Sequence, residues 1–81
     1  MTHEEAFRMV TETMVELFDL TPEQLGGEKR LFEDLGLDSI DAIDMAAKLH
    51  ESTGQRVEDK DLRAIRTVDD VVSLVVRMTE A

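Results

Sequence analysis

The sequence contains no cysteine, and this absence excludes several kinds of chemistry at once. Without a thiol the chain can form neither a disulfide nor a zinc–thiolate site, and it has no Cys nucleophile. The N-terminal stretch MTHEEAF is acidic and lacks the apolar run of a signal peptide, and no segment approaches the length of a membrane span. We therefore expect a cytoplasmic protein that is not inserted into a membrane.

Basic residues are also scarce. Nine Lys and Arg residues stand against nineteen Asp and Glu residues, which gives a net charge of −10 in 81 residues. Such a surface disfavours nucleic acid, whose phosphates need a basic footprint, and it disfavours docking on anionic lipids. A basic protein surface is the natural partner. The length allows one domain with limited burial, for which a hydrophobic fraction of 42% is adequate, and we expect a monomer.

Recognisable catalytic arrangements are absent as well. His3 and His50 lie far apart in the sequence, and there is neither an H-x-x-x-H pair nor a glycine-rich phosphate loop. A chain this short can hardly build the deep pocket that would separate the pKa values of paired carboxylates. The spacing of Asp34, Asp38 and Asp41 does not fit the EF-hand pattern, although a weak, nonspecific divalent site stays open. We predict no intrinsic catalysis and no dedicated metal site.

The sequence predicts an all-α fold, a small bundle of three main helices plus one short helix, with a long loop between the first two main helices. The segment VVSLVV is rich in β-branched residues and would suit a strand, but the cap before it and the absence of a partner strand favour a helix. The expected elements are a helix over residues 3–18 capped by Thr2 and Glu5, one helical turn after Thr21, a loop from Glu28 to Leu37, a helix from Asp38 to Gly54, a short helix over Asp59–Arg63, and a last helix capped by Thr67 and Asp70.

Apolar residues at steps of three and four predict the buried side of each helix. Apolar residues in the long loop are expected to pin it onto the core, and short connections predict antiparallel neighbours. The expected core residues are Phe7, Val10, Met14 and Leu17 in the first helix, Leu31, Phe32, Leu35 and Leu37 in the loop, Leu62 and Ile65 around the short helix, and Val68, Val71, Val72, Val75 and Met78 in the last helix.

The second main helix has two distinct sides when its residues are placed about 100° apart. One side is an apolar core stripe, and the opposite side mixes apolar groups with carboxylates. An isoleucine on that opposite side favours a docking surface for a basic partner, but one exposed isoleucine is ordinary, so the pattern leaves docking and chance equally open. The stripe is Ala42, Met45, Ala46 and Leu49, and the opposite side is Ile40, Asp44, Ala47 and Glu51, with Ile43 at the border.

The stretch DLGLDSID, residues 34–41, places Ser39 at the start of this helix. A serine there can be a helix cap or a point of chemical attachment. Asp38 is the better cap, which leaves the Ser39 hydroxyl free. From Phe32 to Ala47 there are five acids and no basic residue. Capping and the helix dipole explain Asp38 and Asp41. The acids that they do not explain are Glu33, Asp34 and Asp44.

The segment LFEDLGLDSIDAIDMAAKL, residues 31–49, closely resembles the attachment segment of acyl carrier proteins, in which D-S-L or D-S-I opens the second helix. The D-S-I triplet alone is a weak motif. Together with the preceding EDLGL, the helix order, the length and the charge, it is strong. The resemblance covers nearly the whole chain, with VEDKDLRAI as the short third helix and RTVDDVVSLV as the fourth, and it implies a single acyl carrier domain over residues 1–81.

The resemblance implies that Ser39 receives 4'-phosphopantetheine from coenzyme A and that Asp38 assists this modification. A separate phosphopantetheinyl transferase would supply base and magnesium. The thiol of the arm would then hold acyl groups as thioesters, which brings thiol chemistry to a chain without cysteine. Acyl-transferring, condensing and reducing enzymes of fatty-acid or polyketide type, with basic docking surfaces, would be the partners. The docking residues expected from the helix and the family pattern are Ile40, Asp41, Ile43, Asp44, Ala47 and Glu51, and those expected around the acyl chain are Val10, Met45, Ala46 and Ile65.

The sequence departs from the fatty-acid pattern in the later turns of the second helix, which are usually more acidic. Lys48, His50 and Thr53 occupy that region, and Ala47 stands where a bulkier apolar contact is common. These changes leave a dedicated carrier for a specialised pathway open. Peptidyl carriers usually have a G-G-H/D-S sequence before the serine, and the present sequence fits the acyl branch better. The alternative function is an acidic helical adaptor or divalent-ion-binding protein with an unmodified Ser39.

Overall fold

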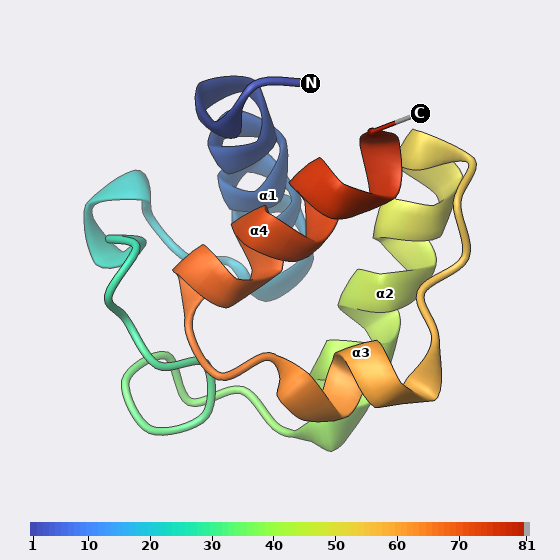
Figure 1. Ribbon diagram of the computed structural model, residues 1–81. Coiled ribbons are helices and arrows are strands. Elements are labelled where there is room, and N and C mark those ends of the chain that lie inside the picture. Colours follow the sequence, from blue (N-terminus) through green and yellow to red (C-terminus); the bar gives the residue numbers. More distant parts are fainter. Residues whose placement is uncertain (81) are drawn as a thin grey trace.

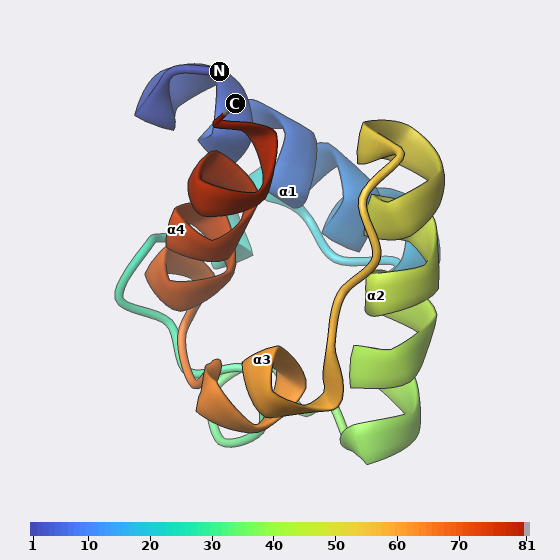
Figure 2. The ribbon, with the colours of Figure 1, turned by 45° about the vertical axis from the view of Figure 1, so that its right-hand side comes forward.

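The computed structural model describes residues 1–80, and within them it contains helices and no strand. Three long helices pack together, and the short α3 lies beside the beginning of α2 (Figures 1 and 2). The prediction of an all-α bundle with three main helices, one short helix and a long first loop is confirmed. In order, the elements are α1 (His3–Phe18), the 3-10 helix η1 (Pro22–Gln24), α2 (Ser39–Thr53), α3 (Asp59–Ala64) and α4 (Val68–Thr79).

Each long helix begins with a reciprocal capping box. The cap side chain accepts the N–H of the third helical residue, whose carboxylate accepts the N–H of the cap residue. Both bonds satisfy N–H groups that have no partner inside the helix, which explains why the helix starts could be located from sequence. At the far end of α2, Gly54 has a φ of 73° and ends the helix in the left-handed conformation, as predicted. The three capping pairs are Thr2–Glu5, Asp38–Asp41 and Thr67–Asp70.

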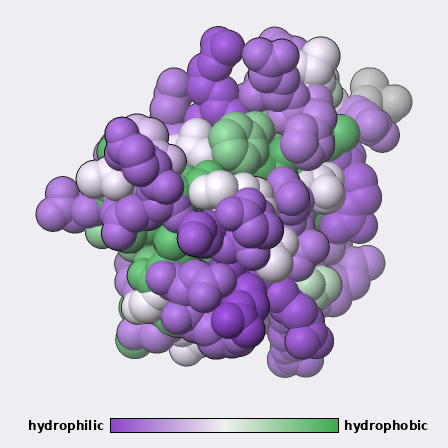
Figure 3. Space-filling model, turned by 90° about the vertical axis from the view of Figure 1, so that its left-hand side faces the viewer, coloured by the Kyte–Doolittle hydropathy of each residue, from purple (hydrophilic) through white to green (hydrophobic). Residues whose placement is uncertain are grey.

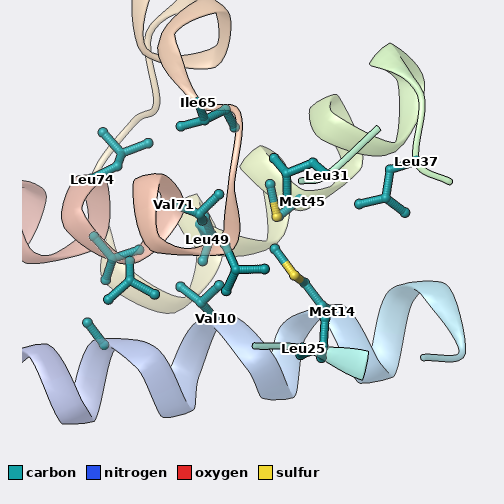
Figure 4. Packing of buried hydrophobic residues seen from close by; sticks show 14 residues of the cluster. Val10, Met14, Leu25, Leu31, Leu37, Met45, Leu49, Ile65, Val71 and Leu74 are labelled. Carbon is teal, nitrogen blue, oxygen red and sulfur yellow. The ribbon is translucent and has the colours of Figure 1, made fainter. Parts of the chain in front are cut away.

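The hydrophobic core lies where α1, α2 and α4 meet. Met14 of α1 and Met45 of α2 point toward each other, and Leu49 and Val71 lie beside them (Figure 4). The core stripe predicted for α2 is buried in full, as are four of the five residues predicted for α4, and Met78 is half-buried. Buried residues that the apolar pattern did not single out are Ala6, Thr13, Leu25 and Leu74.

Two core predictions are wrong. Leu17 is 37% exposed. It keeps nearly the same angle around the helix as Val10, because seven residues make almost two full turns, so its exposure follows from its place in the last turn of α1, just before the left-handed Asp19. Phe32 is 46% exposed. Its neighbour Leu31 is buried, and the adjacent side chain is therefore directed outward.

The long loop is fixed to the start of α4 by backbone hydrogen bonds. The N–H of Leu31 donates to the carbonyl of Arg66 at 2.9 Å, and the N–H of Val68 donates to the carbonyl of Lys29 at 3.0 Å. The loop leucines Leu31 and Leu37 are buried, as predicted, and Leu35 is half-buried. The loop and the α3–α4 connection therefore lie side by side and face the beginning of α2.

Hydrophilic side chains cover most of the face shown in Figure 3, and hydrophobic residues gather in patches between them. This distribution agrees with the excess of acids in the sequence. Among residues 1–80, no helix has both the length and the apolar character needed to cross a membrane.

Candidate functional site

Ser39 is the first residue of α2 and is exposed. The cap of this helix does not use its hydroxyl, because the Asp38 Oδ1 accepts the N–H of Asp41 at 2.9 Å and the Asp41 Oδ2 accepts the N–H of Asp38 at 3.0 Å. Of the two roles that a serine can have here, the cap is therefore filled by Asp38. The Ser39 hydroxyl stands in solvent at the positive end of the α2 dipole, which favours a negatively charged substituent.

A cavity of about 870 Å³ lies beside Ser39. This volume is within the range of small-molecule sites, roughly 300–1,000 Å³. The cavity is bounded by the first turns of α2, by α3 with the connection that follows it, and by the long loop. Its apolar lining comes from Phe32, Ala42, Ile43, Leu62 and Ile65. An exposed hydroxyl at the edge of such a cavity fits a long, covalently attached group that can fold back over apolar side chains.

The residues predicted to surround an acyl chain are only partly at this cavity. Ile65 lines it, whereas Val10, Met45 and Ala46 do not. Val10 and Met45 are packed at 0% and 1% exposure among the helices. Both belong to the closed core where α1, α2 and α4 meet. The open volume lies nearer to Ser39, on the α3 side of α2.

The predicted docking face of α2 is exposed beside Ser39. Ile40 and Ile43 are 66% and 58% exposed, which is a large apolar area for one helical turn of a small domain. Asp44, Ala47 and Glu51 are also exposed, and Asp41 is half-buried and occupied in the cap. The helix therefore presents isoleucines flanked by carboxylates.

Lys48, a departure from the usual acidic pattern, has a structural partner. Its Nζ lies 3.4 Å from the Glu16 Oε1 of α1, so it ties two helices together rather than facing outward with Asp44. Such an exposed ion pair contributes at most about 1 kcal/mol. The lysine therefore changes the end of the docking face without reversing the charge beside Ser39.

The acids of the loop are organised by Arg30. Its backbone N–H donates to the Asp34 Oδ2 at 2.8 Å, its Nε lies 3.3 Å from the same oxygen, and its guanidinium also pairs with Glu33. The backbone hydrogen bond, followed by the guanidinium, holds the pKa of Asp34 below its usual value. The hydrogen bond that the Arg30 guanidinium donates to the Asp34 carboxylate, followed by the negative charges of Asp34 and Glu33, raises the pKa of Arg30. Glu33 and Asp34 therefore stabilise the loop turn.

We predict that Asp34→Asn loosens this turn and lowers stability in a pH-dependent way. The folded-state pKa is lowered, so the carboxylate contributes its stability above the unfolded pKa of about 3.9 and loses it as the pH falls through the lower folded value. Urea unfolding at pH 7 and at pH 3 measures the difference between the native and substituted chains, which should shrink in acid. Asp44→Asn is the control on the open side of α2. A difference for Asp34→Asn that is the same at both pH values contradicts this role.

The described residues contain no cluster of side chains that would bind a divalent ion. In residues 1–80 no group of three or more His, Asp or Glu side chains is arranged to hold a metal ion. Asp34, Asp38 and Asp41, which the sequence places close together, each bind a backbone N–H instead.

The comparisons with known proteins agree with this geometry. Residues 8–75 match the family described as the phosphopantetheine attachment site. Acyl carrier protein 2 of Ralstonia nicotianae is 41% identical over 75 residues, which are 93% of this chain and 93% of that protein. The meromycolate extension acyl carrier protein of Mycobacterium tuberculosis is 30% identical over 80 residues, which are 99% of this chain and 70% of that protein.

A crystal structure of an acyl carrier protein from Thermotoga maritima has a TM-score of 0.80 to this fold at 28% identity, covering 94% of this chain and 88% of that one. The class that fold and site define is thus a carrier domain with a covalently attached 4'-phosphopantetheine. The chain belongs to the phosphopantetheine attachment family and is one of the acyl carrier proteins.

Sequence reasoning missed the polar part of the cavity. Arg30, Arg63 and Arg66 line it together with Glu33 and Asp59. The only sequence signal is that Arg63 and Arg66 flank the inward-facing Ile65. Their approach to Ser39 depends on how the α3–α4 connection packs against the loop, which a linear pattern does not encode.

Proposed function

We propose that Ser39 is the attachment residue for 4'-phosphopantetheine. The observation that carries this proposal is that Ser39 has an exposed hydroxyl at the edge of the large cavity, at the start of a helix capped by other groups. In the transferase reaction the Ser39 Oγ bonds to the pyrophosphate phosphorus of coenzyme A that carries the pantetheine. The P–O bond to the second phosphate breaks, the serine proton passes to a base of the transferase, and 3',5'-ADP leaves. When bound, the group supplies the thiol that the cysteine-free chain lacks.

The residues around Ser39 have separate parts in this proposal. Asp38 positions the serine by fixing the first turn, and it assists the modification from the exposed start of α2. Ile40 and Ile43 lose water-exposed area on contact with a partner, and Asp44 and Glu51 orient a basic surface by charge. Ala47 lets that surface approach the helix closely. Asp41 contributes charge and completes the cap.

The proposal extends to the whole chain and its partners. Residues 1–81 form one acyl carrier domain that works as a monomer in the cytoplasm, and catalysis is left to the partner enzymes. Besides the transferase, these are acyl-transferring, condensing and reducing enzymes of fatty-acid or polyketide type. The similarity to a protein named for meromycolate extension supports a role in a specialised pathway.

Intact mass tests the attachment. The chain is incubated with coenzyme A, magnesium and a promiscuous phosphopantetheinyl transferase, and we expect one phosphopantetheine group per molecule. Ser39→Ala should abolish the mass gain. Ser52→Ala, on an exposed position of the same helix, is the matched control and should be loaded like the native chain. A native chain that gains no mass, or a Ser39→Ala chain that still gains the group, contradicts the proposal. Either result favours the alternative, an acidic helical adaptor with an unmodified Ser39.

A further inference from the structure

The cavity beside Ser39 differs in charge from the rest of the molecule. Three of the nine basic residues of the chain line it, Arg30, Arg63 and Arg66, against two of the nineteen acids, Glu33 and Asp59. The lining therefore has a net charge of +1 (three minus two), whereas the whole chain has a net charge of −10. A cavity that only had to hold a hydrocarbon would need no such concentration of arginine.

The three arginines are not equivalent. Arg30 is occupied by Glu33 and Asp34 within its own turn. Arg63 and Arg66 are exposed, and within residues 1–80 neither side chain forms an ion pair. Their guanidinium groups are free to receive an anion. A guanidinium suits a carboxylate better than an ammonium does, because its planar N–H groups match both carboxylate oxygens.

The apolar part of the same cavity limits what that anion can be attached to. Ala42 and Ile65 are buried and Leu62 is half-buried, so together they give the cavity that Ser39 and the two arginines also line an apolar floor. A plain alkyl chain would use the floor and leave both guanidinium groups without a partner. A hydrocarbon chain that ends in a carboxylate would use both.

We propose that this cavity selects acyl cargo with a terminal carboxylate, and that Arg63 and Arg66 bind this carboxylate while the hydrocarbon part rests on the apolar floor. The inference rests on the proposed attachment at Ser39 and specifies the class of cargo carried there. Tethering favours the contact, because a cargo on an arm fixed at Ser39 is present at a high effective concentration near the cavity.

Thermal unfolding of loaded chains tests the inference. The transferase is supplied with hexanoyl-coenzyme A or with adipoyl-coenzyme A, two cargoes of equal chain length that differ by the terminal carboxylate, and loading is verified by mass. In the native chain the adipoyl form should melt about 2–4 °C above the hexanoyl form, the size that one partly exposed ion pair gives in a small domain. In R63Q/R66Q the order should reverse, because an added negative charge then only repels an acidic chain.

Matched controls separate the outcomes. R8Q/R77Q removes two exposed arginines of α1 and α4 and should keep the native order of melting temperatures. An adipoyl form that melts no higher than the hexanoyl form in the native chain overturns the inference, and so does an unchanged order in R63Q/R66Q.

The phosphate of the arm is the other nearby anion. The melting temperatures of the cargo-free holo form and of the adipoyl form are each compared with that of the apo form. If R63Q/R66Q lowers both differences equally, the arginines bind the phosphate and the inference is wrong. A native chain that gains no mass overturns the proposed attachment itself, before any melting is measured, and this inference falls with it.

Discussion

Replacing Leu49 with alanine is expected to lower the free energy of unfolding by about 2–5 kcal/mol. Leu49 lies in the packed region between the long helices and is 1% exposed, so truncation leaves a void that its neighbours can fill only in part. Small domains are stable by roughly 5–15 kcal/mol, and each kcal/mol shifts their Tm by about 4–8 °C. We therefore expect a fall in Tm of at least about 8 °C, measured by circular dichroism, with urea unfolding for the free energy.

Leu17→Ala is the matched control, because the same side chain is removed from another α-helix. Leu17 is 37% exposed, so its truncation should cost less than about 1 kcal/mol. The apolar pattern of the sequence predicts that both leucines are buried, whereas in the structure only Leu49 is buried. Equal losses of stability in the two variants would contradict the packing described for α1 and α2.

The Asp44→Lys substitution should lower the kcat/KM of partner enzymes that act on this chain about tenfold at low ionic strength. Asp44 is exposed on α2, on the side that also presents Ile40 and Ile43. A lysine there repels the basic surface that the acidic helix attracts. The measured quantity is kcat/KM for loading by the phosphopantetheinyl transferase, determined from low to high salt. The defect should shrink as salt increases, because exposed charges are screened.

Glu23→Lys gives the same change in net charge on η1, which packs against α1. Its effect on kcat/KM should be small if docking depends on the charge pattern of α2 rather than on total charge. Equal defects in Asp44→Lys and Glu23→Lys would mean that the partner responds only to net charge, and the proposed docking face would be abandoned. The Tm of both variants verifies that the fold is kept.

The sequence predicted the helices well because local chemistry determines where they start and end. Thr2, Asp38 and Thr67 each satisfy N–H groups of the turn that follows, and Gly54 supplies the left-handed residue after α2. The same local logic separated the roles of Asp38 and Ser39. It also placed Ile40 on the open side of α2, since the angle between helical residues is known in advance.

Features that depend on packing between distant segments could not be predicted in this way. Phe32 is exposed because Leu31 takes the inward direction in a turn whose backbone bonds to Arg66. The cavity lies between a loop and α3, segments separated by all of α2, and only their arrangement in space brings Arg63 to the neighbourhood of Ser39. Hydrophobic periodicity describes one helix at a time and contains no information on open volume between elements.

Peptide mapping of the loaded protein tests the central claim most directly. The chain has three serines, Ser39, Ser52 and Ser73, and trypsin cleavage after Lys and Arg places them in the separate peptides 31–48, 49–56 and 67–77. Tandem mass spectrometry of protein from its native cell, or of protein loaded with coenzyme A, then locates the group. We predict phosphopantetheine, with or without cargo, on peptide 31–48 and on Ser39 alone. The group on either other serine peptide, or its absence from peptide 31–48 in fully loaded protein, would contradict the account.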